Sequence, residues 1–175
     1  MLARAAAQPT TLVIGIDAVA SALAVSSARA ARPARKGGLA NALFAVASAE
    51  APPPELLGRV PELTVLFPWG SLLRGVVGVD PAAAAGLAGL LAPEGRLVAL
   101  VATHPRDRLA DIPCAGQLLA DPSPLGRRWE EYGLTLCSLR AATAAEARAT
   151  GSSWARRLAT GRLRTVARIE LNRNR

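Results

Sequence analysis

The stretch LTVLFPWGSLL, residues 63–73, begins with the apolar side chains of a strand and then meets Pro68, Trp69 and Gly70. The apolar run predicts a buried strand over 63–68. We expect it to end at Pro68, because proline lacks the backbone N–H that a strand interior needs. The chain has only three tryptophans in 175 residues. A core has little use for one of them at the frayed end of a strand. Trp69 therefore suggests that the carboxyl end of this strand has a role other than packing.

Outward from this strand, short β-type runs alternate with alanine-rich segments that suit helices. The predicted strands cover 11–17, 42–50, 63–68, 96–103, 134–142 and 164–171, and the predicted helices cover 18–31, 80–95 and 125–133. This alternation predicts an α/β fold with a mostly parallel sheet covered on both faces and an antiparallel last strand. In such sheets ligands bind at the carboxyl ends of the strands. Asp17, Glu50 and Trp69 should then lie along one crevice.

The positive charge is concentrated at the end of the chain. The formal net charge is +8, and residues 140–175 contribute +7 of it through nine arginines and two glutamates. A basic tail favours a polyanionic partner. Nucleic acid is preferred to anionic lipid, because the tail lacks the large apolar face of a membrane-surface helix. The length predicts a single domain over 1–175, and we expect a cytoplasmic protein without a membrane partner.

The cysteines and the histidine form no metal-binding pattern. Cys114 and Cys137 lack CxxC spacing, and His104 is the only histidine. A zinc site and a histidine-based triad are therefore disfavoured. We expect two reduced cysteines in the core and no metal.

Two predicted strand ends carry acids that can be interpreted in two ways. Asp17 ends VIGID, where an acid can take the ribose hydroxyls of a nucleotide, but aspartate also starts helices. Glu50 ends ASAE, whose small residues would let a flat adenine approach the backbone. A polar strand end explains Glu50 equally well. The residues alone leave both alternatives open.

Two basic segments point to RNA. In SSWARRLATGRLR, residues 152–164, Trp154 lies among arginines, the pairing that stacks an unpaired base and holds its phosphates. The alternative is a basic helix whose tryptophan packs on the core. ARAARPARKGG, residues 28–38, is by default a solvated helix face and gains an RNA interpretation only beside the first segment. Trp129, next to two glutamates, is expected to be a packing residue.

Together and in this order, GID, KGGLANALF, ASAE, LFPWGSLL and SSWARRLATGRLR resemble segments of a known family. This family comprises the aminoglycoside-resistance methyltransferases of the kanamycin–apramycin type, which modify N1 of adenine 1408 in 16S rRNA. The resemblance runs from about Leu12 to about Leu171. It implies a class I S-adenosylmethionine-dependent, Rossmann-like methyltransferase that acts on the 30S subunit as a monomer. Neutral adenine carries a lone pair on N1, so no general base is required.

The resemblance also implies roles for individual residues. Trp69 and Trp154 would sandwich the flipped target base as the catalytic pair. Asp17 would bind the cofactor ribose, and Ala49 and Glu50 would border its adenine. The full cofactor set is Asp17, Ala49, Glu50, Leu66, Phe67, Pro68, Trp69, Gly70, Ser71, Ser152, Ser153 and Trp154. The RNA set, from segments 28–38 and 143–164, is Arg29, Arg32, Lys36, Arg157, Arg162 and Arg164.

One feature of the family has no counterpart in these 175 residues. The glycine-rich loop of such folds lies about 20 residues before the ribose-binding acid, which is upstream of Met1. We therefore expect an N-terminally truncated fold without its central first strand, either because translation starts upstream or because the chain is truncated. Its two neighbours would have unpaired edges, and a chain truncated in this way should bind S-adenosylmethionine poorly. The alternatives are a non-catalytic RNA-binding remnant and a class I methyltransferase that acts on another RNA.

Overall fold

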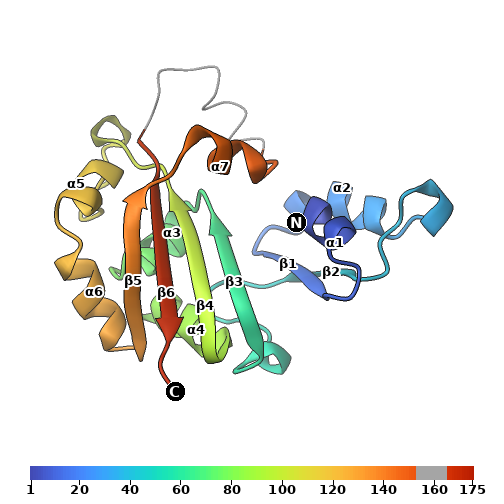
Figure 1. The fold of residues 1–175 in the computed structure, drawn as a ribbon, viewed down its shortest axis with the longest axis horizontal. Helices are drawn as coiled ribbons and strands as arrows, with labels where there is room; N and C mark the ends of the chain where they lie inside the picture. Colours follow the sequence, from blue (N-terminus) through green and yellow to red (C-terminus); the bar gives the residue numbers. More distant parts are fainter. Residues whose placement is uncertain (153–164) are drawn as a thin grey trace. The chain divides into compact units, whose positions relative to one another are not determined.

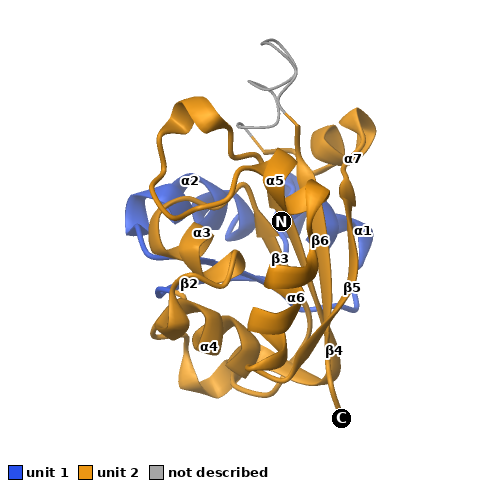
Figure 2. Cartoon of the chain, turned by 90° about the vertical axis from the view of Figure 1, so that its left-hand side faces the viewer, with its two compact units in different colours: residues 1–48 blue, residues 49–175 orange. Residues whose placement is uncertain are grey.

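The computed structural model describes residues 1–152 and 165–175. Five predicted site residues lie outside the described residues: Ser153, Trp154, Arg157, Arg162 and Arg164. The chain divides into two compact units, residues 1–48 and 49–175, which Figure 2 distinguishes by colour. Each unit has its own sheet and its own buried cluster.

The first unit is a small two-stranded α/β unit. In chain order it consists of α1 (Leu2–Ala7), β1 (Val13–Asp17), α2 (Ala20–Ala30), the 3-10 helix η1 (Ala34–Lys36) and β2 (Ala42–Val46). β1 and β2 pair in parallel over their whole length. The buried cluster is formed by Ala5, Ala30 and Ala42, with Phe44 among the partly buried residues packed against it. Alanine side chains allow close approach, so this core is thin.

Asn41 connects the end of α1 to the start of β2. Its Nδ2 lies 3.0 Å from the carbonyl oxygens of Ala5 and Gln8 and 2.9 Å from that of Thr11. Carbonyl groups at the end of a helix lack an intrahelical donor. The two N–H groups of one side-chain amide are thus shared among three carbonyl oxygens, one in the last turn of α1 and two in the connection that follows it.

The second unit contains a four-stranded sheet in the order β3-β4-β6-β5. Its elements are η2 (Pro54–Leu56), β3 (Val60–Leu66), α3 (Gly70–Val76), α4 (Pro81–Leu90), β4 (Leu91–Val101), η3 (Pro105–Asp107), α5 (Ala115–Ala120), α6 (Ser123–Glu130), β5 (Leu134–Ala141), α7 (Ala144–Ala149) and β6 (Ala167–Arg173). β3 and β4 are parallel, whereas β6 is antiparallel to both of its neighbours, β4 and β5. Figure 1 shows α3 and α4 behind this sheet. The main core joins the strands to α3, α4, α5 and α6.

Trp129 is part of this core. Its side chain is fully buried, and its Nε1 donates to the carbonyl oxygen of Val76 at 3.1 Å. The ring also meets Tyr132 edge to face, with centroids 6.0 Å apart. The prediction that Trp129 is a packing residue is confirmed.

α4 begins as predicted and ends earlier. Asp80 is the N-cap, and its Oδ1 accepts from the N–H of Ala83 at 3.1 Å. The prediction that this helix continues to residue 95 is wrong, because α4 ends at Leu90 and β4 starts at Leu91. Pro93 explains the early end, since proline removes an N–H and disfavours a helical conformation in the residue before it.

Other predicted elements are present with shifted ends. All six predicted strands occur, and the last is antiparallel as expected. The second strand stops at Val46, so Ala49 and Glu50 lie beyond it. The prediction that the first strand is buried is wrong, because Asp17 is exposed and the rest of β1 is half-buried. Within the described ranges, β2 is the one strand that pairs with β1.

The expectation that both cysteines lie in the core is also wrong. Both are free, but Cys114 is half-buried and Cys137 is exposed. Cys137 lies where the pairing of β5 with β6 shifts register, between Leu136 and Ser138. The burial pattern of β5 alternates from Leu134 to Cys137, and Cys137 falls on the exposed side together with Thr135.

No single helix in the part of the chain that the structure describes is long and apolar enough to cross a membrane. Taken together, α3 and α4, which are bent by 72° at the break between them, reach the necessary length and apolar composition, and nothing more than length and composition supports a span there.

Candidate functional site

Two aromatic side chains just beyond the carboxyl end of β3 lie in different environments. The N–H of Phe67 donates to the carbonyl oxygen of Leu100 at 2.8 Å, and its buried ring packs in a cluster that includes Leu100 and Ala102. Phe67 has φ 51°, the left-handed region that side chains other than glycine rarely adopt. Trp69 follows with an extended backbone as the N-cap of α3, and its side chain is 45% exposed. The strand end thus buries one ring and presents the other.

The rest of the 66–71 segment follows the same division. Leu66 is half-buried and Pro68 is buried, whereas Gly70 and Ser71 are exposed. Gly70 has φ 59°, which glycine adopts without strain, and it is the first residue of α3. The exposed part of this predicted cofactor segment is therefore Trp69 to Ser71.

Ala49 and Glu50 lie in the connection that leads to β3. Ala49 is half-buried and packs against the main core, and Glu50 is exposed. The backbone of Ala49 lies against Gly86 of α4. The connection thus lies against α4 at Ala49, and the next residue, Glu50, has an exposed side chain.

Asp17 lies at the end of β1 in the first unit. Its Oδ1 accepts from the N–H of Val19 at 2.8 Å, the turn that leads into α2. Val19, rather than Asp17, is the N-cap of that helix. The side chain therefore shapes the entry to α2, and its carboxylate stays exposed at the end of the strand.

The predicted crevice draws on both units. Asp17 belongs to residues 1–48, whereas Glu50 and Trp69 belong to residues 49–175. That Asp17, Glu50 and Trp69 line one crevice therefore stays a prediction. Within the second unit, the structure places the exposed Trp69 at the carboxyl end of β3 as expected.

Beside the basic segment 152–164, ion pairs tie α7 to the sheet. Thr143 and Glu146 form a capping box at the start of α7. Glu146 also pairs with Arg140 of β5, and its Oε1 lies 3.8 Å from the Nε of Arg168 in β6. The hydrogen bond from Arg140 lowers the pKa of Glu146 to about 2. Ser152, just beyond α7, donates its N–H to Thr150 Oγ1 at 3.2 Å.

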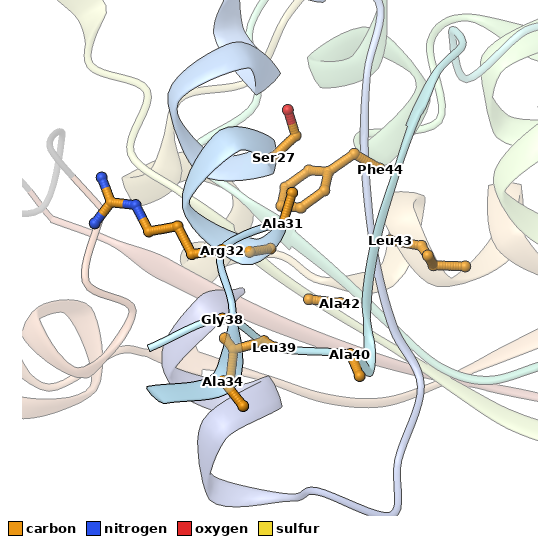
Figure 3. Close-up of a pocket in the computed structure, with 11 residues that line it drawn as sticks. Ser27, Ala31, Arg32, Ala34, Gly38, Leu39, Ala40, Ala42, Leu43 and Phe44 are labelled. Atoms are coloured by element: carbon orange, nitrogen blue, oxygen red, sulfur yellow. The ribbon is translucent and has the colours of Figure 1, made fainter. Parts of the chain in front are cut away.

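The first basic segment surrounds a shallow pocket of about 490 Å³ in the first unit, shown in Figure 3. Mostly small, apolar side chains from α2, the 34–40 connection and β2 line it, together with Ser27, Arg32 and Phe44. Arg29, Arg32 and Lys36 are exposed, and Figure 3 shows the guanidinium of Arg32 extending away from the pocket. These three predicted RNA contacts are accessible cations rather than parts of an enclosed site.

A second cavity, of about 640 Å³, adjoins the carboxyl end of β4. Its lining includes His104, whose Nδ1 accepts from the backbone N–H of Arg106 at 3.1 Å and whose backbone N–H donates to Oδ2 of Asp107 at 2.9 Å. Because β3 and β4 are parallel neighbours, this cavity and Trp69 lie at the same edge of the sheet. The one signal of this cavity in the sequence is a polar, proline-bearing stretch after a buried strand.

The fold is shared with known methyltransferases. The crystal structure of the 16S rRNA methyltransferase KamB matches with a TM-score of 0.89 and 33% identity, covering 99% of this chain and 82% of that one. A tryptophan-to-alanine mutant of the 16S rRNA (adenine(1408)-N(1))-methyltransferase from Catenulisporales acidiphilia, solved with the cosubstrate SAM, matches with a TM-score of 0.86 and 30% identity, covering 99% and 80%. The α/β fold with its mixed sheet is that of the class I methyltransferases.

The chain belongs to the NpmA family of 16S rRNA (adenine(1408)-N(1))-methyltransferases, whose model matches residues 1–172. A relative of that name from Streptoalloteichus hindustanus is 38% identical over 160 residues, which are 88% of this chain and 72% of the relative. Another from Escherichia coli is 29% identical over 164 residues, 91% of this chain and 75% of the relative. The family resemblance stated from the motifs is confirmed.

Proposed function

We propose that this chain methylates N1 of adenine 1408 in 16S rRNA within the 30S subunit and thereby confers resistance to aminoglycosides such as kanamycin and apramycin. The observation that carries the proposal is the exposed indole of Trp69 at the carboxyl end of β3, in a chain of this family. An exposed aromatic at a strand end can stack a base. The protein acts in the cytoplasm, as a monomer and a single domain over residues 1–175.

The cofactor in this proposal is S-adenosylmethionine, which supplies an electrophilic methyl group when bound. The chemistry of the available donors fits it. The exposed carboxylates of Asp17 and Glu50 can accept from ribose hydroxyls and from the exocyclic amine of adenine. Small Ala49 leaves room for a flat ring beside the backbone. The proposed cofactor segment also includes Leu66 to Ser71 and Ser152, with Ser153 in the part of the chain outside the described residues.

The target base is held by two indoles in this proposal, Trp69 and Trp154. Methylation of N1 makes the adenine ring cationic, and each indole face favours that charge by about 0.5–2 kcal/mol. Flipping the base out of its stack costs a few kcal/mol. Contacts of Arg29, Arg32 and Lys36, and of Arg157, Arg162 and Arg164, with rRNA phosphates offset this cost. Positioning supplies most of the remaining rate enhancement.

The test is the effect of Trp69→Ala on methylation of purified 30S subunits. Loss of a stacking face costs about 1–3 kcal/mol, so kcat/KM should fall about 5- to 150-fold. Methylation of the adenine is read by primer extension, because a methyl on N1 blocks base pairing. Trp69→Phe, which keeps an aromatic face, should retain most of the activity.

Two outcomes would contradict the proposal in different ways. Equal activity in Trp69→Ala and the unaltered chain would remove the base-stacking role. An unaltered chain that binds 30S subunits but neither binds S-adenosylmethionine in calorimetry nor methylates would favour a non-catalytic RNA-binding protein.

A further inference from the structure

Gly86 occupies the middle of α4, in the sequence PAAAAGLAGL. Glycine weakens a helix interior relative to alanine, and its neighbours here are mostly alanine. The reason for glycine lies outside the helix. A Cβ at residue 86 would be 1.8 Å from the carbonyl oxygen of Ala49 and 3.3 Å from Cδ of Pro52. The absence of a side chain thus lets the backbone of residues 49–52 lie directly on α4.

Other glycines of the same helical layer differ in what they contact. At Gly89, one turn further along α4, a Cβ would meet only Cδ2 of Leu57 at an ordinary 3.6 Å. At Gly75 in α3, a Cβ would be 2.6 Å from Cβ of Ala83, a contact between two helices. Among these three, Gly86 is the one at which a Cβ would clash with the backbone of the connection that leads out of β2.

That connection has little freedom to move away. The side chain of Ala49 packs against the main core, and Pro52 to Pro54 restrict the backbone that follows. Further along, the N–H of Gly58 donates to the carbonyl oxygen of Gly89 at 2.8 Å, a second attachment to α4. Glu50, the exposed acid, lies between the contact at Gly86 and the prolines. Its position therefore depends on how closely Ala49 approaches the helix.

We propose that Gly86 is a positioning residue for cofactor binding: by admitting the carbonyl group of Ala49 onto α4, it sets the place of Ala49 and Glu50 beside the cofactor's adenine. This inference rests on the proposed function, because it takes S-adenosylmethionine as the ligand of that segment. Gly86 does not touch the ligand itself. It acts through the backbone of the connection, and it is distant in sequence from the residues it positions.

The consequence of adding a methyl group at this position is specific. Gly86→Ala forces Ala49 away from α4 by more than about 1 Å, since a contact of 1.8 Å is impossible. A misplacement of about 1 Å in a binding group can cost on the order of 10²-fold. We expect the affinity for S-adenosylmethionine to fall about tenfold or more. Turnover at saturating cofactor should change little, because Trp69 lies on a different connection.

The experiment is calorimetric titration of S-adenosylmethionine into the full chain and three variants. Gly86→Ala should weaken binding, whereas Gly89→Ala, the same substitution one turn away, should bind within about twofold of the unaltered chain. Ala49→Gly removes the methyl group that packs on the main core and gives the backbone at this contact more freedom without crowding α4, so it should also weaken binding. It keeps the test decisive if Gly86→Ala does not fold.

A double-mutant cycle with Glu50→Gln identifies the route of the effect. If Gly86 acts by placing Glu50, the two losses of affinity are not additive, and Gly86→Ala costs less once Glu50 is changed. Additive losses, or cofactor binding by folded Gly86→Ala equal to that of the unaltered chain, would overturn the positioning role while leaving the proposed function intact. Failure of the unaltered chain to bind would overturn both.

Discussion

Phe67 and Trp69, two residues apart, lie in opposite environments. Phe67 has a positive φ of 51° and a buried ring, while Trp69 is 45% exposed. A residue other than glycine in this region of backbone space costs about 1–3 kcal/mol. Packing of the Phe67 ring against Leu100 and Ala102 offsets that cost. Such local strain beside an exposed aromatic side chain supports a binding role for Trp69.

The same substitution at two tryptophans should separate stability from function. Trp129→Phe leaves the carbonyl of Val76 without its indole donor and opens a space in the core, so the free energy of unfolding should fall by about 2–4 kcal/mol. Trp69→Phe should change it by no more than about 0.5 kcal/mol. Urea unfolding measures both. Equal losses would mean that Trp69 is a structural residue.

At the scale of elements, α7 depends on a few polar contacts. It has six residues, and Ala147 is its buried residue. The capping box of Thr143 and Glu146 starts the helix, and the same carboxylate pairs with Arg140 and approaches Arg168. Short helices are marginal without tertiary contacts. The two neighbouring strands therefore hold α7 through Glu146, immediately before segment 152–164.

This arrangement predicts a pH dependence of α7. Since Arg140 lowers the pKa of Glu146 from 4.5 to about 2, the carboxylate contributes stability fully above about pH 4.5 and loses it as the pH falls toward 2. The protection of the α7 amides against hydrogen exchange, measured relative to the intrinsic exchange rate at each pH, should therefore fall in that range. In Glu146→Gln the exchange should be fast already at pH 7, with much less acid dependence.

The matched control is Glu130→Gln, which removes an exposed glutamate from α6. It should leave exchange in α7 unchanged. Slow exchange in Glu146→Gln at neutral pH would show that packing of Ala147, rather than the ion pairs, holds the helix.

At the scale of the whole molecule, the arginines of the basic tail are not equivalent. Arg173 donates to the carbonyl oxygens of Ala88 and Leu91 at the end of α4, and Arg175 pairs with Glu94. Arg140 and Arg168 are engaged around Glu146. The net charge of the tail therefore overstates what it offers to a polyanion. The exposed cations of segment 28–38 share that role in our proposal.

Salt dependence should distinguish these two kinds of arginine. If Arg32 contacts an rRNA phosphate, Arg32→Ala should reduce the slope of log affinity for 30S subunits against log salt by about 0.7–0.9. Arg175→Ala removes the same charge from an intramolecular pair and should leave the slope unchanged. Filter binding over a series of salt concentrations gives both slopes. Equal slopes in all three proteins would exclude Arg32 as a contact.

Several features were predictable because their causes are local in sequence. Asp80 followed by Pro81 marks the start of α4, since an N-cap needs only its own helix. The proline after Phe67 ends β3 and leaves Trp69 beyond the strand. Helix α5 was missed because its six residues lie in a stretch of prolines and polar residues that resembles a loop.

The amino-acid sequence by itself determined the six strands in chain order, the helices α2, α4 and α6, the family, and the position of Trp69 at the end of a strand. These follow from hydrophobic periodicity, from proline and capping residues, and from motifs, all of which act over a few neighbouring residues. Only the tertiary structure decided that Gly86 receives the backbone of Ala49, that Glu146 joins two strands to α7, and that Cys137 is exposed. These depend on contacts between residues far apart in the chain, whose distances no local pattern encodes.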